Sequence, residues 1–194
     1  MRRFAVLTVF LLGACSGSGS PQAVPVPVPS VGPSCLSAAP SPSPRPAVTA
    51  GGSAAALPDA VLRCFVGGEP ARLSQVSAPA IINLWASWCP PCQAELPAFQ
   101  RYVSRAGNRV NLVGVITADE DRDKLRRTVD RFQLTFPMVE DPEQKVLVGV
   151  GKQNLPVTLF VAADGRIAHV YNAQALDEPA IASLAERYLG VVVP

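Results

Sequence analysis

Two cysteines that enclose two prolines are the first candidates for chemistry in this 194-residue chain. Cys89 and Cys92 lie in "NLWASWCPPCQAELP", where an apolar run ends and a polar, helix-like segment begins. A thiolate at a helix N-terminus is stabilised by the helix dipole, so we expect Cys89 to be the attacking sulfur. Cys92, one turn further on, would resolve the mixed disulfide. The pattern therefore favours a redox-active dithiol.

Metal binding and an inert disulfide fit these two cysteines less well. A structural zinc site needs four nitrogen or sulfur ligands, whereas the chain has one histidine, His169, which we expect to be an ordinary surface side chain. An inert bridge between residues three apart would close too short a loop to stabilise a fold. We predict no metal site, and because no cofactor-binding motif is present, no cofactor.

The N-terminus has the pattern of an export signal. Arg2 and Arg3 precede "FAVLTVFLL", which is too short to span a bilayer as a stable anchor. The next residues, "LGAC", resemble the lipobox of bacterial lipoproteins. This resemblance implies a signal peptide over residues 1–14 and a lipidated Cys15, held on the membrane by two or more acyl chains. The alternative is an ordinary signal peptide with a chance cysteine.

Residues 15–56 differ in composition from the rest of the chain. They are rich in proline, serine, alanine and glycine, which favours extended polyproline II. We interpret them as a stalk that holds a domain, residues 57–194, away from the membrane; the alternative is a plain disordered tail. Cys35 in this stalk would be an exposed thiol outside the cell unless it pairs with Cys64. We predict a structural Cys35–Cys64 disulfide, the alternative being that Cys64 is a buried apolar residue.

Charge gives no support for a nucleic-acid partner. The formal net charge is +2, from 17 basic and 15 acidic residues. Removal of Arg2 and Arg3 with the signal peptide leaves 15 of each, so the expected mature chain is neutral. No long basic run or basic, aromatic-rich patch is present.

From residue 57 onward, apolar periodicity predicts an alternating α/β chain. We expect first a hairpin around Gly67-Gly68, a buried strand over 80–86, a helix over 90–106 with a kink at Pro97, and a strand over 109–117. These are followed by a helix over 121–134 and a short helix over 141–150 capped by Asp141. The last elements are a hairpin over 157–172 turned at Asp164-Gly165 and a helix capped by Asp177 and ended by Gly190.

This order brings three distant segments to one edge of a sheet. Strand, helix, strand is by default a right-handed parallel unit, and ligands bind where its strands end. The cysteine loop follows the first of these strands, and the acidic residues 118–121 follow the second. The hairpin strand runs the opposite way, so Leu155 and Pro156, which precede it, lie on the same edge.

The cysteine motif, together with "NLPVTLFVAADGRI", resembles the TlpA/ResA-like branch of the thioredoxin family over roughly residues 57–190. The resemblance implies a thioredoxin fold, with a central mixed sheet flanked by helices and an N-terminal β-hairpin extension. It also implies that Trp88 flanks the motif and that Pro156 is a cis-proline whose preceding peptide pairs with the substrate backbone.

The family also has a carboxylate close to the buried cysteine. We expect this role for Asp119 or Glu120; the alternative for both is a solvated acidic loop that caps the next helix. Asn83, where thioredoxin has a buried aspartate, suits this branch. Glu95, one turn beyond Cys92, is interpreted as structural.

The resemblance implies an extracytoplasmic thiol–disulfide oxidoreductase, lipid-anchored to the outer face of the cell membrane. Its partners would be protein thiols or disulfides and a membrane redox partner, and we expect a monomer. Pro90 and Pro91 bring no N–H to stabilise a thiolate, so we predict a reductant. By family analogy it would act on exported cysteines such as those of apocytochrome c. The alternatives are a disulfide-forming oxidase, a thiol peroxidase and a metal-binding lipoprotein.

Overall fold

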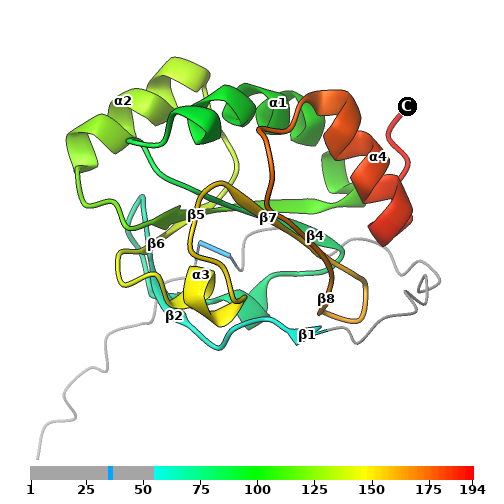
Figure 1. Ribbon diagram of the computed structural model, residues 1–194, viewed down its shortest axis with the longest axis horizontal. Coiled ribbons are helices and arrows are strands. Elements are labelled where there is room, and N and C mark those ends of the chain that lie inside the picture. The colour runs from blue at the N-terminus through cyan, green and yellow to red at the C-terminus, as the bar shows by residue number, and fades with distance from the viewer. Residues whose placement is uncertain (1–34, 37–54) are drawn as a thin grey trace, which may run out of the picture. The chain divides into compact units, whose positions relative to one another are not determined.

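The computed structural model describes residues 35–36 and 55–194 (Figure 1). The expected signal peptide, the lipidation site Cys15 and most of the expected stalk lie outside these residues. The strands are β1 (Ala55–Ala56), β2 (Val61–Cys64), β3 (Ala71–Arg72), β4 (Ala80–Trp85), β5 (Asn111–Thr117), β6 (Met138–Asp141), β7 (Val157–Val161) and β8 (Arg166–Tyr171). The helices are α1 (Pro90–Ala106), α2 (Arg122–Phe132), α3 (Lys145–Gly149) and α4 (Glu178–Leu189), with short 3-10 turns η1 (Leu73–Gln75) and η2 (Gly107–Arg109).

The strands form one mixed sheet in the order β1-β8-β7-β4-β5-β6-β2-β3. Strands β4, β5 and β6 are parallel to one another, and β7 is antiparallel to β4. The expected strand–helix–strand unit is thus present, with α1 connecting the parallel strands β4 and β5. The N-terminal β2–β3 pair is antiparallel, as expected, and β2 extends the sheet by pairing with β6.

Strand β4 lies at the centre of the sheet because both of its faces are apolar. Ile81 and Trp85 pack into the core cluster that contains α1, α2 and α4. Ile82 and Leu84 point to the opposite face, into the cluster that contains α3. Figure 1 shows the same division, with α1, α2 and α4 along one face and α3 on the other. A central strand buried on both faces gives the loop that follows it a rigid base.

Helix α1 begins at the cysteine pair for local reasons. Cys89 is its N-cap, and Pro90 and Pro91 occupy the first two positions, where a missing N–H is tolerated. Its buried face, which includes Leu96 and Phe99, packs on the sheet. The helix continues past Pro97 to Ala106, and the expected kink stays a prediction.

The segment around Asp141 differs from its sequence interpretation. Residues 138–141 form β6, a strand that the pattern "MVED" did not suggest because two of its four residues are acidic. The short helix starts at Lys145, three residues later than its expected first position, Pro142, and its N-cap is Gln144 rather than Asp141. Asp141 still holds the start of this helix from the end of β6, because its carboxylate accepts the backbone N–H groups of Lys145 and Val146, both at 2.8 Å.

Other local expectations are confirmed. Asp177 caps α4 by accepting the N–H of Ala180, and Gly190 ends that helix in the left-handed conformation. The β7–β8 hairpin turns at Asp164-Gly165, where the Asp164 carboxylate accepts the N–H of Arg166. Within residues 35–36 and 55–194, no helix is long and apolar enough to cross a membrane.

Candidate active site

Cys89 and Cys92 form a disulfide at the start of α1, with their Cα atoms 5.3 Å apart. Cys92 is fully buried and Cys89 is 3% exposed, whereas the adjoining Trp88 is 52% exposed. Within the motif, the N–H of Cys92 donates to the Cys89 sulfur at 3.3 Å. Because neither proline has an N–H, this is the main-chain donor that the enclosed stretch offers to a Cys89 thiolate.

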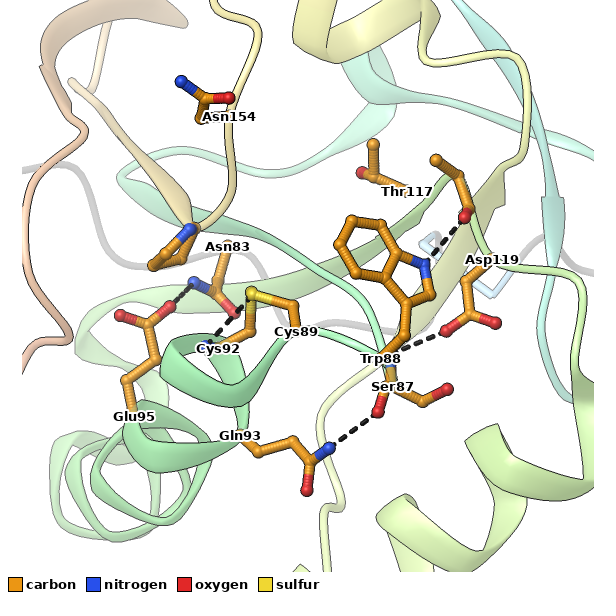
Figure 2. Close-up of a disulfide and its surroundings, with 12 residues drawn as sticks. Asn83, Ser87, Trp88, Cys89, Cys92, Gln93, Glu95, Thr117, Asp119 and Asn154 are labelled. Carbon is orange, nitrogen blue, oxygen red and sulfur yellow. Dashed lines mark hydrogen bonds between the residues drawn. A yellow bond between two sulfur atoms is a disulfide. The ribbon is translucent and has the colours of Figure 1, made fainter.

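The loop before the disulfide is fixed by hydrogen bonds from two sides (Figure 2). The buried Asp119 carboxylate accepts the N–H of Ser87 at 2.6 Å, and its other oxygen accepts the N–H of Asp121 at 3.1 Å. From α1, the Gln93 side-chain amide donates to the Ser87 carbonyl at 2.6 Å. The Trp88 indole N–H donates to the carbonyl of Ala118 at 2.9 Å. The loop after β5 therefore supports the loop after β4.

The structure places the two expected carboxylates differently from each other. Asp119 is buried and hydrogen-bonded to the backbone of the cysteine loop, whereas Glu120 is exposed to solvent. A role for either at Cys92 stays a prediction. Their neighbour Asp121 caps α2 by accepting the N–H of Lys124.

The carboxyl group that the fold buries on the Cys92 face of α1 belongs to Glu95. Residues three apart on a helix share a face, so Glu95 lies one turn beyond Cys92. It is fully buried, and one oxygen accepts the side-chain N–H of Asn83 at 2.7 Å. The other oxygen accepts the N–H of Leu176 at 3.1 Å. Burial raises the pKa of Glu95 from 4.5 to about 7, against the opposing effect of these two hydrogen bonds.

Sequence reasoning treated Glu95 as structural, although a signal for another role was available. An acidic residue on the same helix face as the buried Leu96 and Phe99 cannot be fully solvated. Figure 2 shows its side chain directed toward Asn83, with which it forms a hydrogen bond. Asn83 also donates to Thr158 on β7 at 3.3 Å, so the buried polar group joins α1, β4 and β7.

Pro156 is buried and follows a cis peptide bond with Leu155. The side-chain amide of Asn172 donates to the carbonyls of Asn154 and Pro156, at 3.1 and 2.8 Å, on either side of Leu155. Within the described chain, the backbone N–H and C=O of Leu155 have no hydrogen-bond partner. Leu155 lines the same pocket as Trp88 of the cysteine loop. Sequence reasoning missed Asn172, which no motif marks.

The other two cysteines that the structure describes are also joined. Cys35 and Cys64 form a disulfide with a Cα–Cα distance of 5.9 Å, and the following Leu36 is 2% exposed. Cys35 and Cys64 pack in the core cluster on the α3 side of the sheet. Cys89 and Cys92 belong to the cluster on the opposite side.

The described residues contain no group of three or more histidine, cysteine or acidic side chains that could hold a metal ion. His169 is half-buried rather than an ordinary surface side chain: its ring stacks on that of Tyr188, with centroids 4.1 Å apart. Burial, with the Arg187 charge, lowers its pKa.

The sequence model of the AhpC/TSA family matches residues 54–170, more than half of the chain. The chain belongs to the AhpC/TSA family. Two curated relatives are both called thiol-disulfide oxidoreductase ResA. The protein from Halalkalibacterium halodurans is 25% identical over 128 residues, covering 66% of this chain and 70% of the relative. The protein from Geobacillus kaustophilus is 28% identical over 149 residues, covering 76% and 80%.

Solved structures with low identity support the fold of this AhpC/TSA-family chain. A DsbF homologue from Corynebacterium diphtheriae matches with a TM-score of 0.62 at 18% identity, covering 75% of this chain and 98% of its own. The thioredoxin-like fold and the resemblance to ResA-type proteins are thus confirmed. The protein is an oxidoreductase of the thiol–disulfide class.

Proposed function

We propose that this enzyme exchanges disulfides with cysteines of partner proteins through Cys89 and Cys92. The observation that carries this proposal is the arrangement around the pair. Cys89 caps a helix, Cys92 is buried one turn further on, and Leu155, whose backbone N–H and C=O are open, lines a pocket with the adjoining Trp88. An extended partner chain that hydrogen-bonds to Leu155 would present its own sulfur to Cys89.

As a reductant, the enzyme works in two steps. The Cys89 thiolate attacks one sulfur of a partner disulfide, forming a mixed disulfide and releasing one partner thiolate, which takes up a proton. The Cys92 thiolate then attacks the Cys89 sulfur and releases the second partner thiolate. Two electrons pass to the partner, and the enzyme is left as the disulfide seen in the structure. A dithiol protein at the membrane would restore the reduced pair.

Glu95 is suited to accept the proton of the Cys92 thiol in the second step. The Cys92 thiol must lose a proton before it can attack, and the site is closed to water around it. A buried carboxyl group with a pKa of about 7, one turn away, can accept a proton near neutral pH. Asp119 instead fixes the position of the cysteine loop, because its carboxylate accepts the backbone N–H of Ser87.

The activity is tested by reduction of insulin disulfides with dithiothreitol as electron source. The Cys89→Ser variant should lose the activity. The Cys92→Ser variant should accumulate mixed disulfides with partners, visible on non-reducing gels and identifiable by mass spectrometry. If Cys92→Ser traps no partner in cells, or if the wild type turns over hydrogen peroxide but not insulin, the proposal is wrong, and the second result favours a thiol peroxidase.

We further infer that the pair acts as a reductant, with exported cysteines such as those of apocytochrome c as substrates. The support is the scarcity of thiolate stabilisers, because the prolines leave Cys92 as the one N–H donor within the motif. A less stable thiolate makes a weaker oxidant. Titration of the pair against glutathione should give a potential well below the roughly −120 mV of DsbA-type oxidases. A value near that figure would support the oxidase alternative.

The proposed location is the outer face of the cell membrane, with a lipid on Cys15 and a monomeric domain carried by the stalk. The support is the lipobox-like "LGAC" after a short apolar run. The wild-type protein should partition into the detergent phase, and Cys15→Ala should move to the aqueous phase. A Cys15→Ala protein that stays membrane-bound would rule out this anchor.

A further inference from the structure

A pocket of about 370 Å³ lies beside the cysteine loop and has no charged residue in its lining. Its lining includes Trp88 from that loop, Thr117 and Ala118 from the end of β5, and the amides Gln144, Gln153 and Asn154. Figure 2 shows Asn154 across from Trp88 and Thr117. The volume is at the lower end of the roughly 300–1,000 Å³ typical of ligand pockets. It is therefore large enough for one side chain of a partner.

The backbone around this pocket carries two unusual conformations. Ala118 and Gln144 both have positive φ, +53° and +59°, without being glycine. Over the described part of the chain, three non-glycine residues have positive φ, and two of them line this pocket. Such conformations are unfavourable for residues with a Cβ, and they gather at binding sites, where the surrounding fold holds them in place.

We propose that this pocket receives an uncharged aromatic side chain of the partner, two residues from its reacting cysteine. The inference rests on the disulfide exchange proposed above. Trp88 supplies the reason for an aromatic group, because it is 52% exposed and its N–H is already bonded to Ala118. The exposed ring of the indole remains available for contact, and aromatic rings pack favourably against one another.

The lining also disfavours charged side chains. Gln144, Gln153 and Asn154 can hydrogen-bond a phenolic hydroxyl, but they provide no counter-charge for a carboxylate or an ammonium group. A charge that enters the pocket loses part of its hydration without compensation. The enzyme would therefore discriminate against acidic and basic residues at this position.

The spacing of two residues follows from Leu155, which lines the pocket and has an open backbone N–H and C=O. A partner chain that pairs with Leu155 must be extended, and in an extended chain side chains two apart point the same way. When the partner cysteine faces Cys89, the side chain two positions away faces the neighbouring Trp88.

Single-cysteine peptides joined to glutathione through a mixed disulfide test this proposal. Four peptides carry Tyr, Leu, Asp or Lys two residues before the cysteine, and a second set carries them two residues after it. The reduced enzyme attacks the peptide sulfur, releases glutathione as a thiol, and then releases the peptide thiol as its own disulfide forms. In one of the two sets, the second-order rate constant should be about fivefold to tenfold higher for Tyr than for Asp or Lys.

A variant that adds a positive charge to the pocket provides the second measurement. Asn154 is exposed, and its side chain makes no hydrogen bond within the described residues, so Asn154→Lys should fold normally. It should raise the ratio of the Asp-peptide rate to the Lys-peptide rate about tenfold. The matched control is Asn108→Lys, which adds the same charge at an exposed position beyond the opposite end of α1 and should leave this ratio unchanged.

Equal rates for all four peptides in both sets, or an unchanged ratio in Asn154→Lys, would overturn the pocket's role while leaving exchange itself intact. Absence of exchange with every peptide would instead overturn the proposed function. The two failures are therefore distinguishable.

Discussion

Glu95 shows how strongly a single residue depends on its surroundings. Its carboxyl group is fully buried, and the two hydrogen bonds from Asn83 and Leu176 only partly offset the cost of removing a charge from water. The result is a pKa of about 7, so both the protonated and the charged form of Glu95 are populated near neutral pH. A buried carboxyl group with a pKa near 7 can accept and release a proton near neutral pH. Its charged form, however, is less stable in the folded protein than in water.

This cost predicts a pH dependence of stability. The folded protein holds the Glu95 proton more tightly than the unfolded chain, so the free energy of unfolding should fall as pH rises from about 4.5 to about 7 and then level off. The contribution of Glu95 to this fall is on the order of 3 kcal/mol. Glu95→Gln cannot ionise and should lack this contribution. Urea unfolding of the oxidised proteins at several pH values measures it.

The control for this experiment is Glu186→Gln, at an exposed position of α4, which should keep the pH dependence of the wild type. If Glu95→Gln follows the wild-type curve at every pH, the raised pKa is not a property of the folded protein. Exchange rates of Glu95→Gln should also lose part of their rise near neutral pH, because its side chain cannot accept the Cys92 proton.

At the scale of elements, the active-site loop is held by a loop from the neighbouring strand. Strands β4 and β5 are parallel, so the loops that follow them lie at the same edge of the sheet. Asp119 uses this proximity by accepting backbone N–H groups of Ser87 and Asp121 at once. The position of the cysteine loop therefore depends on a carboxylate that lies 32 residues from Ser87 in sequence.

Asp119→Ala should lower the free energy of unfolding by about 1–3 kcal/mol, because it leaves the buried N–H of Ser87 without its acceptor. It should also slow insulin reduction, since the cysteine loop loses a support. Glu120→Ala removes an exposed carboxylate next to it and should change stability by less than about 0.5 kcal/mol. Chemical denaturation of the three proteins makes the comparison. Equal stability of both variants would show that Asp119 does not hold the loop.

At the scale of the whole molecule, the Cys35–Cys64 disulfide links a segment outside the sheet to the end of β2. Leu36, beside it, is almost fully buried in the core cluster on the α3 side. The disulfide thus attaches Cys35, which precedes the first strand in sequence, to the domain. This attachment lies on the opposite side of the sheet from the cluster that holds the redox pair.

Replacement of both residues, Cys35→Ala with Cys64→Ala, should lower the free energy of unfolding by about 3 kcal/mol, because the bridge spans 29 residues and restricts the unfolded chain. Insulin reduction should continue, since the exchange pair is untouched. Urea unfolding without reductant gives the stability change. Recovery of Cys35 as a free, alkylatable thiol from the oxidised wild type would contradict this structural role.

The sequence by itself determined features that depend on near neighbours in the chain. The helix that starts at the cysteine pair, the Asp177 cap, the Gly190 stop and the Asp164-Gly165 turn were all predictable, because each is decided by residues within one helical turn or one hairpin. The strand–helix–strand order was enough to predict the edge on which the site lies. The thioredoxin-like fold was predicted from the resemblance of the cysteine motif and the Pro156 segment to the TlpA/ResA-like branch.

The tertiary structure decided the properties that arise from distant contacts. Glu95 owes its burial and raised pKa to partners that include Leu176, 81 residues away. The role of Asn172 at Pro156, and the uncharged pocket between Trp88 and Asn154, likewise join separate segments. Desolvation and hydrogen bonding depend on what surrounds a group in space, and no local pattern of residues specifies those surroundings.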